Sequence, residues 1–303
     1  MYRLEVICST DAPMLLIFLT FLFQITTTIA APPLRPINLT SFANKRVLII
    51  TAHPDDAEGF SGGLISALQQ RKDVHVSYLI ITSGNAGGKC YQQVSNSTFY
   101  FCEKEEIAYI RRKESIAAGA FLGVENVWRV GLDDGMSVSY HETRVRRAIT
   151  TYVRYYQPHV VLTHSPYPDW NAPPTCNGLC LPPKNWDDLG YHPDHQHVGS
   201  IVYNSLYGSG SSVDNNLLFE DIHVGGNLPK WKIEQLYFFA LTKETMTHYF
   251  ELNADLLNNK VLASSMHRSQ YQGDKPLDTF QWVAEQVGEV CNVSLAEGYQ
   301  GWF

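Results

Sequence analysis

The chain has 303 residues, of which 45% are apolar, and its formal net charge at pH 7 is -7. The apolar content suffices for a full core, and the length allows one large or two small domains. Nucleic-acid binding is not expected, because no basic stretch beyond residues 144–147 stands out. Those arginines are interleaved with apolar residues and predict an ordinary solvated helix face.

The first 31 residues predict a targeting segment. Pro13 to Ala31 is an apolar run without charge that ends in small residues, as a secretory signal peptide does. The alternative is an uncleaved membrane anchor, since the run approaches spanning length. Arg35 and the basic pair Lys45-Arg46 would then favour a cytosolic catalytic domain. We expect residues 1–31 to be this segment and residues 32–303 to be a single catalytic domain.

Beyond this segment, short apolar runs bounded by polar residues alternate with helical patterns. The expected strands are Arg46–Thr51, Val74–Thr82, Asn126–Val130, Pro158–Thr163 and Ile233–Leu241. The expected helices are Gly62–Gln70, Glu103–Leu122, His141–Tyr156, Asp194–Tyr207 and Ala254–His267, with loops at Gly84–Phe101 and Ser165–Tyr191. This alternation predicts a Rossmann-like α/β fold with a mostly parallel sheet flanked by helices. Its site should lie at the carboxyl ends of the strands.

Sequons and cysteines favour the secretory pathway, whether the protein stays in the endoplasmic reticulum, in its membrane or lumen, or is secreted. Glycosylation sequons begin at Asn38, Asn96 and Asn292. Two cysteine pairs, Cys90/Cys102 and Cys176/Cys180, are plausible disulfides in an oxidising compartment, which leaves Cys291 over. A structural zinc at Cys176 and Cys180 is disfavoured, because no second Cys or His pair has the required spacing beside them.

Two polar clusters follow expected strands. The first, His53-Pro54-Asp55-Asp56-Ala57-Glu58, comes directly after the first strand, and the second, His192-Pro193-Asp194-His195-Gln196-His197, follows the long loop. A helix cap accounts for one aspartate but not for a histidine and two aspartates around a proline. Two histidines and one carboxylate drawn from both clusters would suit a catalytic zinc, which takes three protein ligands and leaves a position for water.

The two clusters together, with Ala52 before the first, resemble the LmbE-like/PIG-L de-N-acetylases. Residues 111–124 are similar to the family's Arg-Glu-Ala helix ending in Leu-Gly-Val, and Asp134-Gly135 is similar to its Asp-Gly turn. The resemblance covers roughly Lys45 to Tyr271 and implies the LmbE-like deacetylase fold. One departure is Asp-Asp-Ala-Glu in place of the Asp-Asp-Glu of eukaryotic lipid-linked members, which makes the motif more similar to bacterial ones.

The resemblance implies a role for each site residue. His53, Asp56 and His195 would be the zinc ligands, and Asp55 the general base. His192, protonated, would stabilise the oxyanion, and Asp194 would orient or charge His192. Fe²⁺ would suit the same ligands as Zn²⁺. Arg111 (or Arg112) would contact an anionic part of the substrate, although such arginines are more often surface residues. Tyr167, Trp170 and Trp186 could stack on sugar faces, and packing in the core or loop is the alternative.

The expected function is removal of the N-acetyl group from N-acetylglucosaminyl-phosphatidylinositol or a related GlcNAc conjugate, as in GPI-anchor biosynthesis. The partner would be a GlcNAc-containing glycolipid or amino sugar, with membrane association through the N-terminal segment. One alternative is a secreted deacetylase of free or polymeric amino sugars, and another is a non-catalytic glycan-binding module. A nucleotide-binding oxidoreductase is disfavoured, because no Gly-rich phosphate turn follows the first strand.

Overall fold

The computed structural model describes residues 33–88, 103–166, 192–208, 228–239, 245–271 and 275–302. Residues Leu34–Phe303 form one compact unit. The N-terminal segment, both cysteine pairs, the Asn96 sequon and the loop aromatics Tyr167, Trp170 and Trp186 lie outside the described residues, so the predictions about them stay predictions.

The described strands form one sheet of eight, in the order β1-β7-β8-β6-β5-β2-β3-β4. They are β1 (Arg35–Pro36), β2 (Arg46–Thr51), β3 (His75–Thr82), β4 (Asn126–Leu132), β5 (Val160–Thr163), β6 (Gln235–Phe239), β7 (His248–Glu251) and β8 (Ala296–Trp302). All neighbours pair in parallel except β8, which runs antiparallel to both β6 and β7. The prediction of an α/β fold with a mostly parallel sheet is confirmed.

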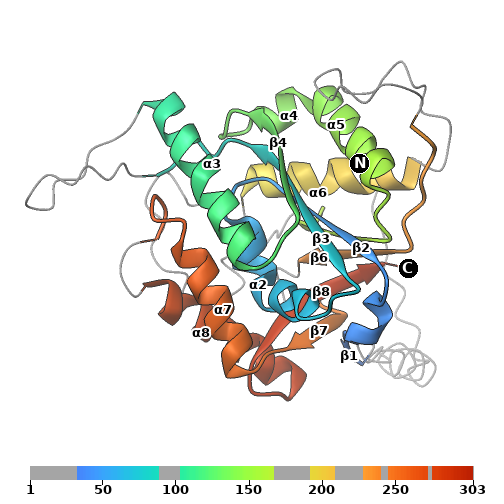
Figure 1. Ribbon diagram of the computed structural model, residues 1–303, viewed down its shortest axis with the longest axis vertical. Coiled ribbons are helices and arrows are strands. Elements are labelled where there is room, and N and C mark those ends of the chain that lie inside the picture. Colours follow the sequence, from blue (N-terminus) through green and yellow to red (C-terminus); the bar gives the residue numbers. More distant parts are fainter. Residues whose placement is uncertain are drawn as a thin grey trace, which may run out of the picture. The chain divides into compact units, whose positions relative to one another are not determined.

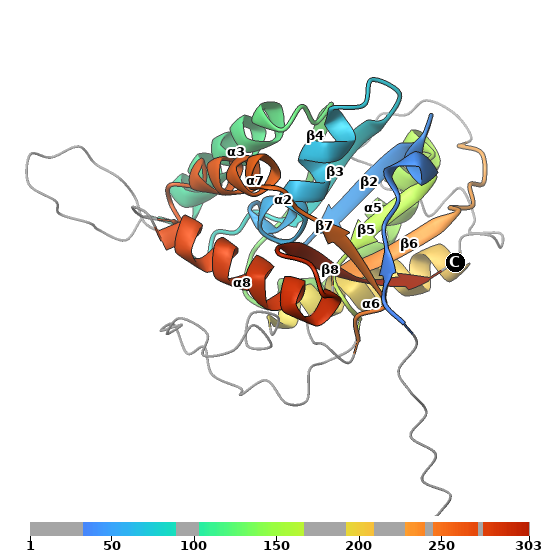
Figure 2. The ribbon, with the colours of Figure 1, turned by 90° about the horizontal axis from the view of Figure 1, so that it is seen from below.

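Helices cover both faces of this sheet (Figure 1). They are α2 (Asp56–Gln69), α3 (Lys104–Phe121), α4 (Ser137–Tyr140), α5 (Glu142–Tyr156), α6 (Pro193–Gly208), α7 (Ala254–Ser265) and α8 (Lys275–Cys291), with a short 3-10 helix η1 at Leu39–Phe42. In the turned view of Figure 2, α2, α7 and α8 lie on one side of the strands, and α5 and α6 on the other.

The core is divided by the sheet because successive side chains of a strand point to opposite faces. In β2, Val47 and Ile49 join the cluster packed under α2, α7 and α8, whereas Leu48 and Ile50 join the cluster packed under α5 and α6. All four are fully buried. A central parallel strand covered on both faces reads as a continuous apolar run, which is why the sequence Val-Leu-Ile-Ile predicts it well.

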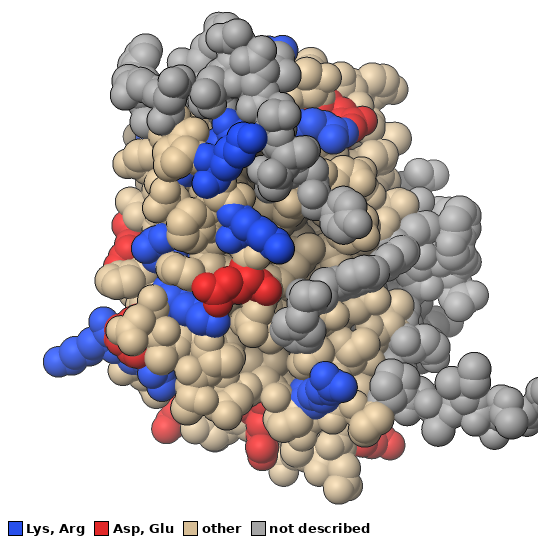
Figure 3. Space-filling model, turned by 90° about the vertical axis from the view of Figure 1, so that its right-hand side faces the viewer, with Lys and Arg blue, Asp and Glu red and all other residues tan. Residues whose placement is uncertain are grey.

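The surface adds little to the functional argument. On the face seen in Figure 3, basic and acidic side chains are interspersed among others. No helix in the described ranges has the length and apolarity to cross a membrane. Asn38 and Asn292, the sequon asparagines that can be assessed, are exposed, and Cys291 is a free, partly buried thiol. The location of the protein in the cell stays a prediction.

Candidate metal centre and active site

Polar side chains converge where the central parallel strands end. The turn after β2 carries His53 to Asp56, β5 is followed directly by His164, and β4 is followed by Asp133 and Asp134. The first turn of α6 adds His195 and its neighbours from the other side. These segments meet because the strands are parallel and adjacent, so their carboxyl ends share one edge of the sheet.

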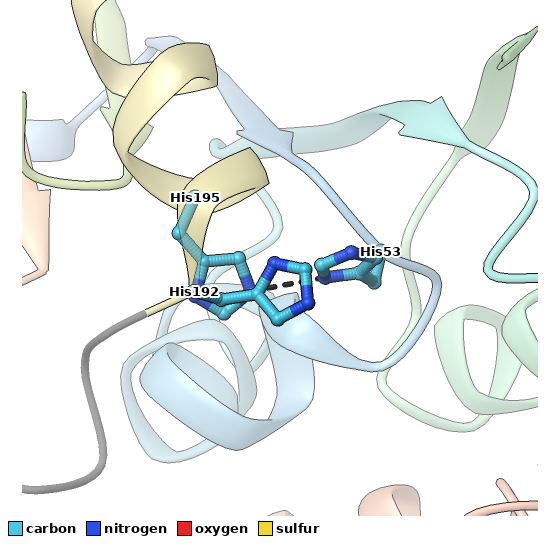
Figure 4. A group of neighbouring side chains, drawn as sticks. All are labelled: His53, His192 and His195. Carbon is cyan, nitrogen blue, oxygen red and sulfur yellow. Dashed lines mark hydrogen bonds between the residues drawn. The ribbon is translucent and has the colours of Figure 1, made fainter. Parts of the chain in front are cut away.

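Three side chains from the two sequence clusters come together here. His53 Nδ1 lies 3.0 Å from His195 Nε2, and Figure 4 shows the two rings facing each other from the β2–α2 turn and from α6. Asp56 Oδ1 lies 3.1 Å from His195 Nε2, and Asp56 Oδ2 lies 3.5 Å from His53 Nδ1. The predicted ligand set therefore forms a compact triplet, although its members come from opposite halves of the chain.

The triplet fits a tetrahedral cation. With metal–ligand bonds of about 2.0–2.1 Å, tetrahedral ligand atoms lie about 3.3 Å apart. The three separations are of this size, although Asp56 approaches His195 with Oδ1 and His53 with Oδ2. The side chains of His53, Asp56 and His195 are only 8%, 8% and 12% exposed. Burial raises the pKa of Asp56, but His195, His164 and His53 more than offset this and hold the pKa well below its ordinary value. Asp56 is therefore ionised at neutral pH, as a metal ligand must be.

His53 is fixed through its second nitrogen. Its Nε2 lies 3.0 Å from Asp134 Oδ1 and 3.7 Å from Asp194 Oδ2. Burial lowers the pKa of His53, but Asp56, Asp134 and Asp194 more than offset this, and the pKa lies well above its ordinary value. A histidine whose far nitrogen donates to a carboxylate presents its near nitrogen to a metal in a fixed orientation. Asn85 supports this arrangement by accepting a hydrogen bond from the backbone of Asp134 at 2.8 Å.

Asp55 stands apart from the triplet. Its carboxylate Oδ1 accepts a hydrogen bond from Arg111 Nη2 at 2.6 Å, and Arg111 Nη1 donates to the carbonyl of Gly84 at 2.7 Å. The Asp55 side chain is 15% exposed and that of Arg111 only 4%. Asp55 thus retains one oxygen that Arg111 does not hold. The buried position of Arg111 suits an orienting role for Asp55, while the predicted contact of Arg111 with substrate stays a prediction.

His192 completes one side of the site. One ligand atom each of His53, His192 and His195 lie within 4.8 Å of one another. His192 Nδ1 accepts a hydrogen bond from the backbone N–H of Asp194 at 3.3 Å. Burial, with the charges of His53 and His195, lowers the pKa of His192 to about 4. This shift favours the neutral ring, and because Nδ1 accepts from the Asp194 backbone, the proton of a neutral ring would be on Nε2, available as a hydrogen-bond donor. The predicted protonation of His192 stays a prediction.

Asp194 is fully buried at the start of α6. Its Oδ2 accepts hydrogen bonds from the backbone N–H groups of Gly135 and Met136, both at 3.1 Å. The carboxylate thereby ties α6 to the Asp-Gly turn after β4. Its predicted action on His192 stays a prediction, and it is the Asp194 backbone N–H that donates a hydrogen bond to His192.

His164 was not among the site residues predicted from the sequence. This side chain is fully buried, and its Nε2 lies 3.0 Å from Asp56 Oδ2. Its ring stacks on His195 with centroids 4.0 Å apart and planes at 6°. Burial, with the charge of His195, lowers the pKa of His164 to about 3, so the ring is neutral. The only signal in the sequence was a histidine directly after a buried strand.

Comparison with known proteins agrees with this geometry. Residues 48–174 match the family model "PIG-L: GlcNAc-PI de-N-acetylase". These residues are similar to a PIG-L (LmbE-like) de-N-acetylase domain. Its predicted resemblance to this family is thus confirmed. The matched range includes the first cluster, Arg111, Asp134 and His164, whereas the second cluster lies beyond it and joins the site through the fold.

Relatives of this chain include enzymes named as deacetylases. It is 27% identical over 230 residues to diacetylchitobiose deacetylase of Thermococcus kodakarensis, covering 76% of this chain and 72% of the relative. It is 24% identical to a probable N-acetyl-alpha-D-glucosaminyl L-malate deacetylase 2 of Bacillus subtilis, covering 54% and 61% of the two chains.

The fold of this chain is also that of a solved deacetylase. The N,N'-diacetylchitobiose deacetylase of Pyrococcus horikoshii, determined with the inhibitor MPG, superposes with a TM-score of 0.65 at 23% identity. The match covers 99% of this chain and 95% of the other.

Glu58 is the position at which the motif departs from that of eukaryotic lipid-linked members. It is fully buried, and its Oε2 lies 3.3 Å from His267 Nε2.

Proposed function

We propose that this protein is a metal-dependent hydrolase that removes the acetyl group from an N-acetylglucosamine unit. The observation that carries the proposal is the buried His53, Asp56 and His195 triplet with Asp55 beside it. Family membership and the names of the relatives support deacetylation as the reaction. Zn²⁺ is the proposed metal, and Fe²⁺ suits the same two histidines and carboxylate.

The bound metal would supply a nucleophile, by lowering the pKa of its water to ~7, and would polarise the acetyl carbonyl. The protein must then move protons and hold charge. Asp55 takes a proton from the attacking water through the oxygen that Arg111 leaves free. As the carbonyl oxygen becomes an oxyanion, His192 Nε2–H donates to it, which contributes about 3 kcal/mol for one well-placed donor. Asp55 then returns its proton to the departing amine.

The substrate class is a GlcNAc conjugate. The relatives named above act on diacetylchitobiose and on GlcNAc-malate, in which the sugar carries a small soluble group. We therefore place a soluble GlcNAc conjugate first. N-acetylglucosaminyl-phosphatidylinositol is the second candidate, because the family model is described by that activity.

The test is acetate release by the purified full chain, stripped with a chelator and reloaded with Zn²⁺ or Fe²⁺. The substrates are N,N'-diacetylchitobiose, GlcNAc-malate and N-acetylglucosaminyl-phosphatidylinositol in mixed micelles. We expect metal-dependent release from the soluble substrates. Release from the lipid alone would replace the first substrate by the second. No release from any of them by metal-loaded protein would contradict the proposed reaction.

We further propose that the N-terminal segment directs the chain into the secretory pathway, which the three sequons favour. Expression of the full chain in cultured eukaryotic cells tests this. We expect the chain to gain mass that a glycosidase removes. The gain should disappear in an Asn38→Gln/Asn292→Gln double variant, or become smaller there if Asn96 is also glycosylated. A chain of unmodified mass would show that the catalytic domain stays on the cytosolic side.

A further inference from the structure

His164 is a buried histidine beside the proposed metal ligands for which the reaction above has no use. We propose that His164 is the positioning residue of Asp56, which it holds by Oδ2 so that Oδ1 is the oxygen presented to the cation. This inference rests on the proposed metal site but not on the proposed substrate.

The two oxygens of Asp56 have different neighbours. Oδ2 accepts a hydrogen bond from the backbone N–H of His53 at 2.6 Å and lies 3.0 Å from His164 Nε2. Oδ1 lies 3.1 Å from His195 Nε2, whereas the shortest contact with His53 Nδ1, at 3.5 Å, is also made by Oδ2. In the part of the chain that the structure describes, Oδ1 is thus the oxygen without a hydrogen-bond donor, apart from its approach to His195. With two donors on Oδ2, the carboxylate cannot rotate to offer both oxygens to a metal without losing a hydrogen bond.

His164 itself has little freedom. Its ring stacks on His195, and the rings of Phe60 and Phe239 meet it edge-on at 5.4 and 5.3 Å. On its backbone side, a Cβ at Gly199 would lie 2.4 Å from the His164 carbonyl oxygen, so α6 packs directly against this residue. A ring held by stacking on one ligand and bonded to another is placed to fix both.

The tautomer of His164 follows from its surroundings. The backbone N–H of Ala52 points at Nε2 from 3.1 Å, the Asp56 carboxylate lies 3.0 Å from the same atom, and Nδ1 is buried without a partner among the described residues. Nε2 can accept from Ala52 only when it carries no proton, and can donate to Asp56 only when it carries one. A neutral ring has one proton. A charge-assisted bond to a carboxylate is about twice as strong as a neutral one, so we place the proton on Nε2, where it donates to Asp56 and the Ala52 N–H loses Nε2 as its acceptor.

The experiment compares three variants of the full chain. In His164→Gln the amide nitrogen reaches the position of Nε2 and donates to Asp56. In His164→Leu the volume is kept and the donor is lost. His248→Leu removes another buried histidine, in β7, which β8, β6 and β5 separate from β2 in the sheet. Each protein is stripped, loaded with Co²⁺, and examined by visible absorption and by competition with a chelator.

We expect His164→Leu to bind Co²⁺ and Zn²⁺ about 10–100-fold more weakly than the wild type, as is typical when a partner of a metal ligand is lost. Its Co²⁺ spectrum should change, because a freed carboxylate alters the number and geometry of the ligands. His164→Gln should recover both properties, and His248→Leu should retain them.

Wild-type metal affinity and an unchanged Co²⁺ spectrum in His164→Leu would overturn the inference. If the leucine variant does not fold, His164→Asn serves instead, because its shorter amide is polar but does not reach Asp56. Inability of the wild type to bind Co²⁺ would overturn this inference and the metal site together. Normal Co²⁺ binding without deacetylation would overturn only the proposed reaction.

Discussion

Asp55 and Asp56 are adjacent in sequence, yet their neighbours divide the chemistry between them. Asp56 is surrounded by His53, His164 and His195, which favour its ionised form and direct it to a cation. Asp55 faces Arg111 and is more exposed. A carboxylate that is both metal ligand and proton acceptor would perform neither role well. The two adjacent aspartates therefore divide these roles, with Asp56 placed for metal binding and Asp55 for proton transfer.

The first prediction separates these roles. Asp55→Asn should retain the metal but lose turnover by a factor of about 10²–10⁴, the usual contribution of a general base. His195→Ala should lose the metal as well, because one of the three ligands is gone. Metal content by elemental analysis and kcat on the same preparations provide the comparison. Equal metal retention in both variants would contradict the assignment.

A second prediction concerns pH. Burial raises the pKa of Tyr237 from 10.0 to about 12. A group whose pKa is raised by folding contributes stability that is present below its unfolded pKa and lost as the pH rises through its folded pKa. The free energy of unfolding should therefore fall between pH 10 and 12, and less steeply in Tyr237→Phe, which keeps the ring. If the free energy of unfolding falls equally steeply with pH in the two proteins across this interval, the prediction is wrong.

At this scale the sequence predicts residues that belong to motifs and misses those that do not. His53, Asp56 and His195 were found because each lies in a dense polar cluster. His164 lies alone after a strand, and its role depends on contacts across 108 residues of sequence. Arg111 was found by its motif, but the distance to Asp55 could not be known before folding.

Among the elements, α2 is the one that joins the site to the rest of the molecule. It begins at Asp56 rather than at the predicted Gly62, and Ser61 interrupts it with non-helical backbone angles. After the interruption, the N–H groups of Gly63 and Leu64 are free to bind Glu297 of β8, both at 2.9 Å. Lys260 of α7 pairs with the same carboxylate at 2.7 Å. A helix end is thus capped by a distant strand.

This contact gives a third prediction. The Glu297 and Lys260 side chains are 2% and 5% exposed, so removing one leaves a buried charge without its partner. Glu297→Ala should lower the free energy of unfolding by about 3–5 kcal/mol. The double variant Glu297→Gln/Lys260→Met should recover much of this loss. Urea denaturation measures both, and a loss below 1 kcal/mol in the single variant would refute the argument.

A fourth prediction concerns the packing of α6 on β5. A Cβ at Gly199 would lie 2.4 to 2.7 Å from backbone atoms of His164 and Ser165, which cannot move as a side chain tip can. Gly199→Ala should therefore cost about 1–3 kcal/mol of stability and weaken metal binding, since it displaces the helix that carries His195. Gly87→Ala, with nothing within 4 Å of its Cβ, is the matched control.

The sequence predicts elements best where pattern and burial agree. The strands β2 and β3 and the helices α3, α5, α6 and α7 were predicted nearly to their ends. The strands β1, β7 and β8 and the helices α4 and α8 were not predicted. β8 includes Gly298 and Gly301 and alternates poorly, and its extended form is imposed by pairing with β6 and β7. The first turn of α2 was not predicted because the glycines around Ser61 disfavour a helix in the sequence pattern.

For the whole molecule, a bound metal would act as a cross-link. His53 and His195 are separated by 142 positions and belong to opposite sides of the site. The order of alternating strands and helices predicts the parallel sheet that brings them together, because parallel strands end at one edge. The place of β8 within that sheet is set by long-range pairing and could not be predicted.

The fifth prediction follows from this cross-link. Chelation should lower the Tm, and added Zn²⁺ should restore it. When the free metal concentration is 100 times its Kd, binding should raise the free energy of unfolding by about 2.7 kcal/mol. The metal-induced shift should be absent in His195→Ala. Calorimetric scans at fixed pH provide the measurement, and an equal shift in that variant would place the metal elsewhere.

The sheet order also determines when the protein can be completed during synthesis. β8 follows every other described strand along the chain, yet it lies between β7 and β6 and so connects β1 and β7 to the remaining strands. Until the ribosome has released that segment, β6 and β7 lack the strand that pairs with both, and the N–H groups of Gly63 and Leu64 in α2 lack Glu297. A message truncated before residue 296 would therefore yield a product containing every proposed metal ligand but lacking the strand that supports them.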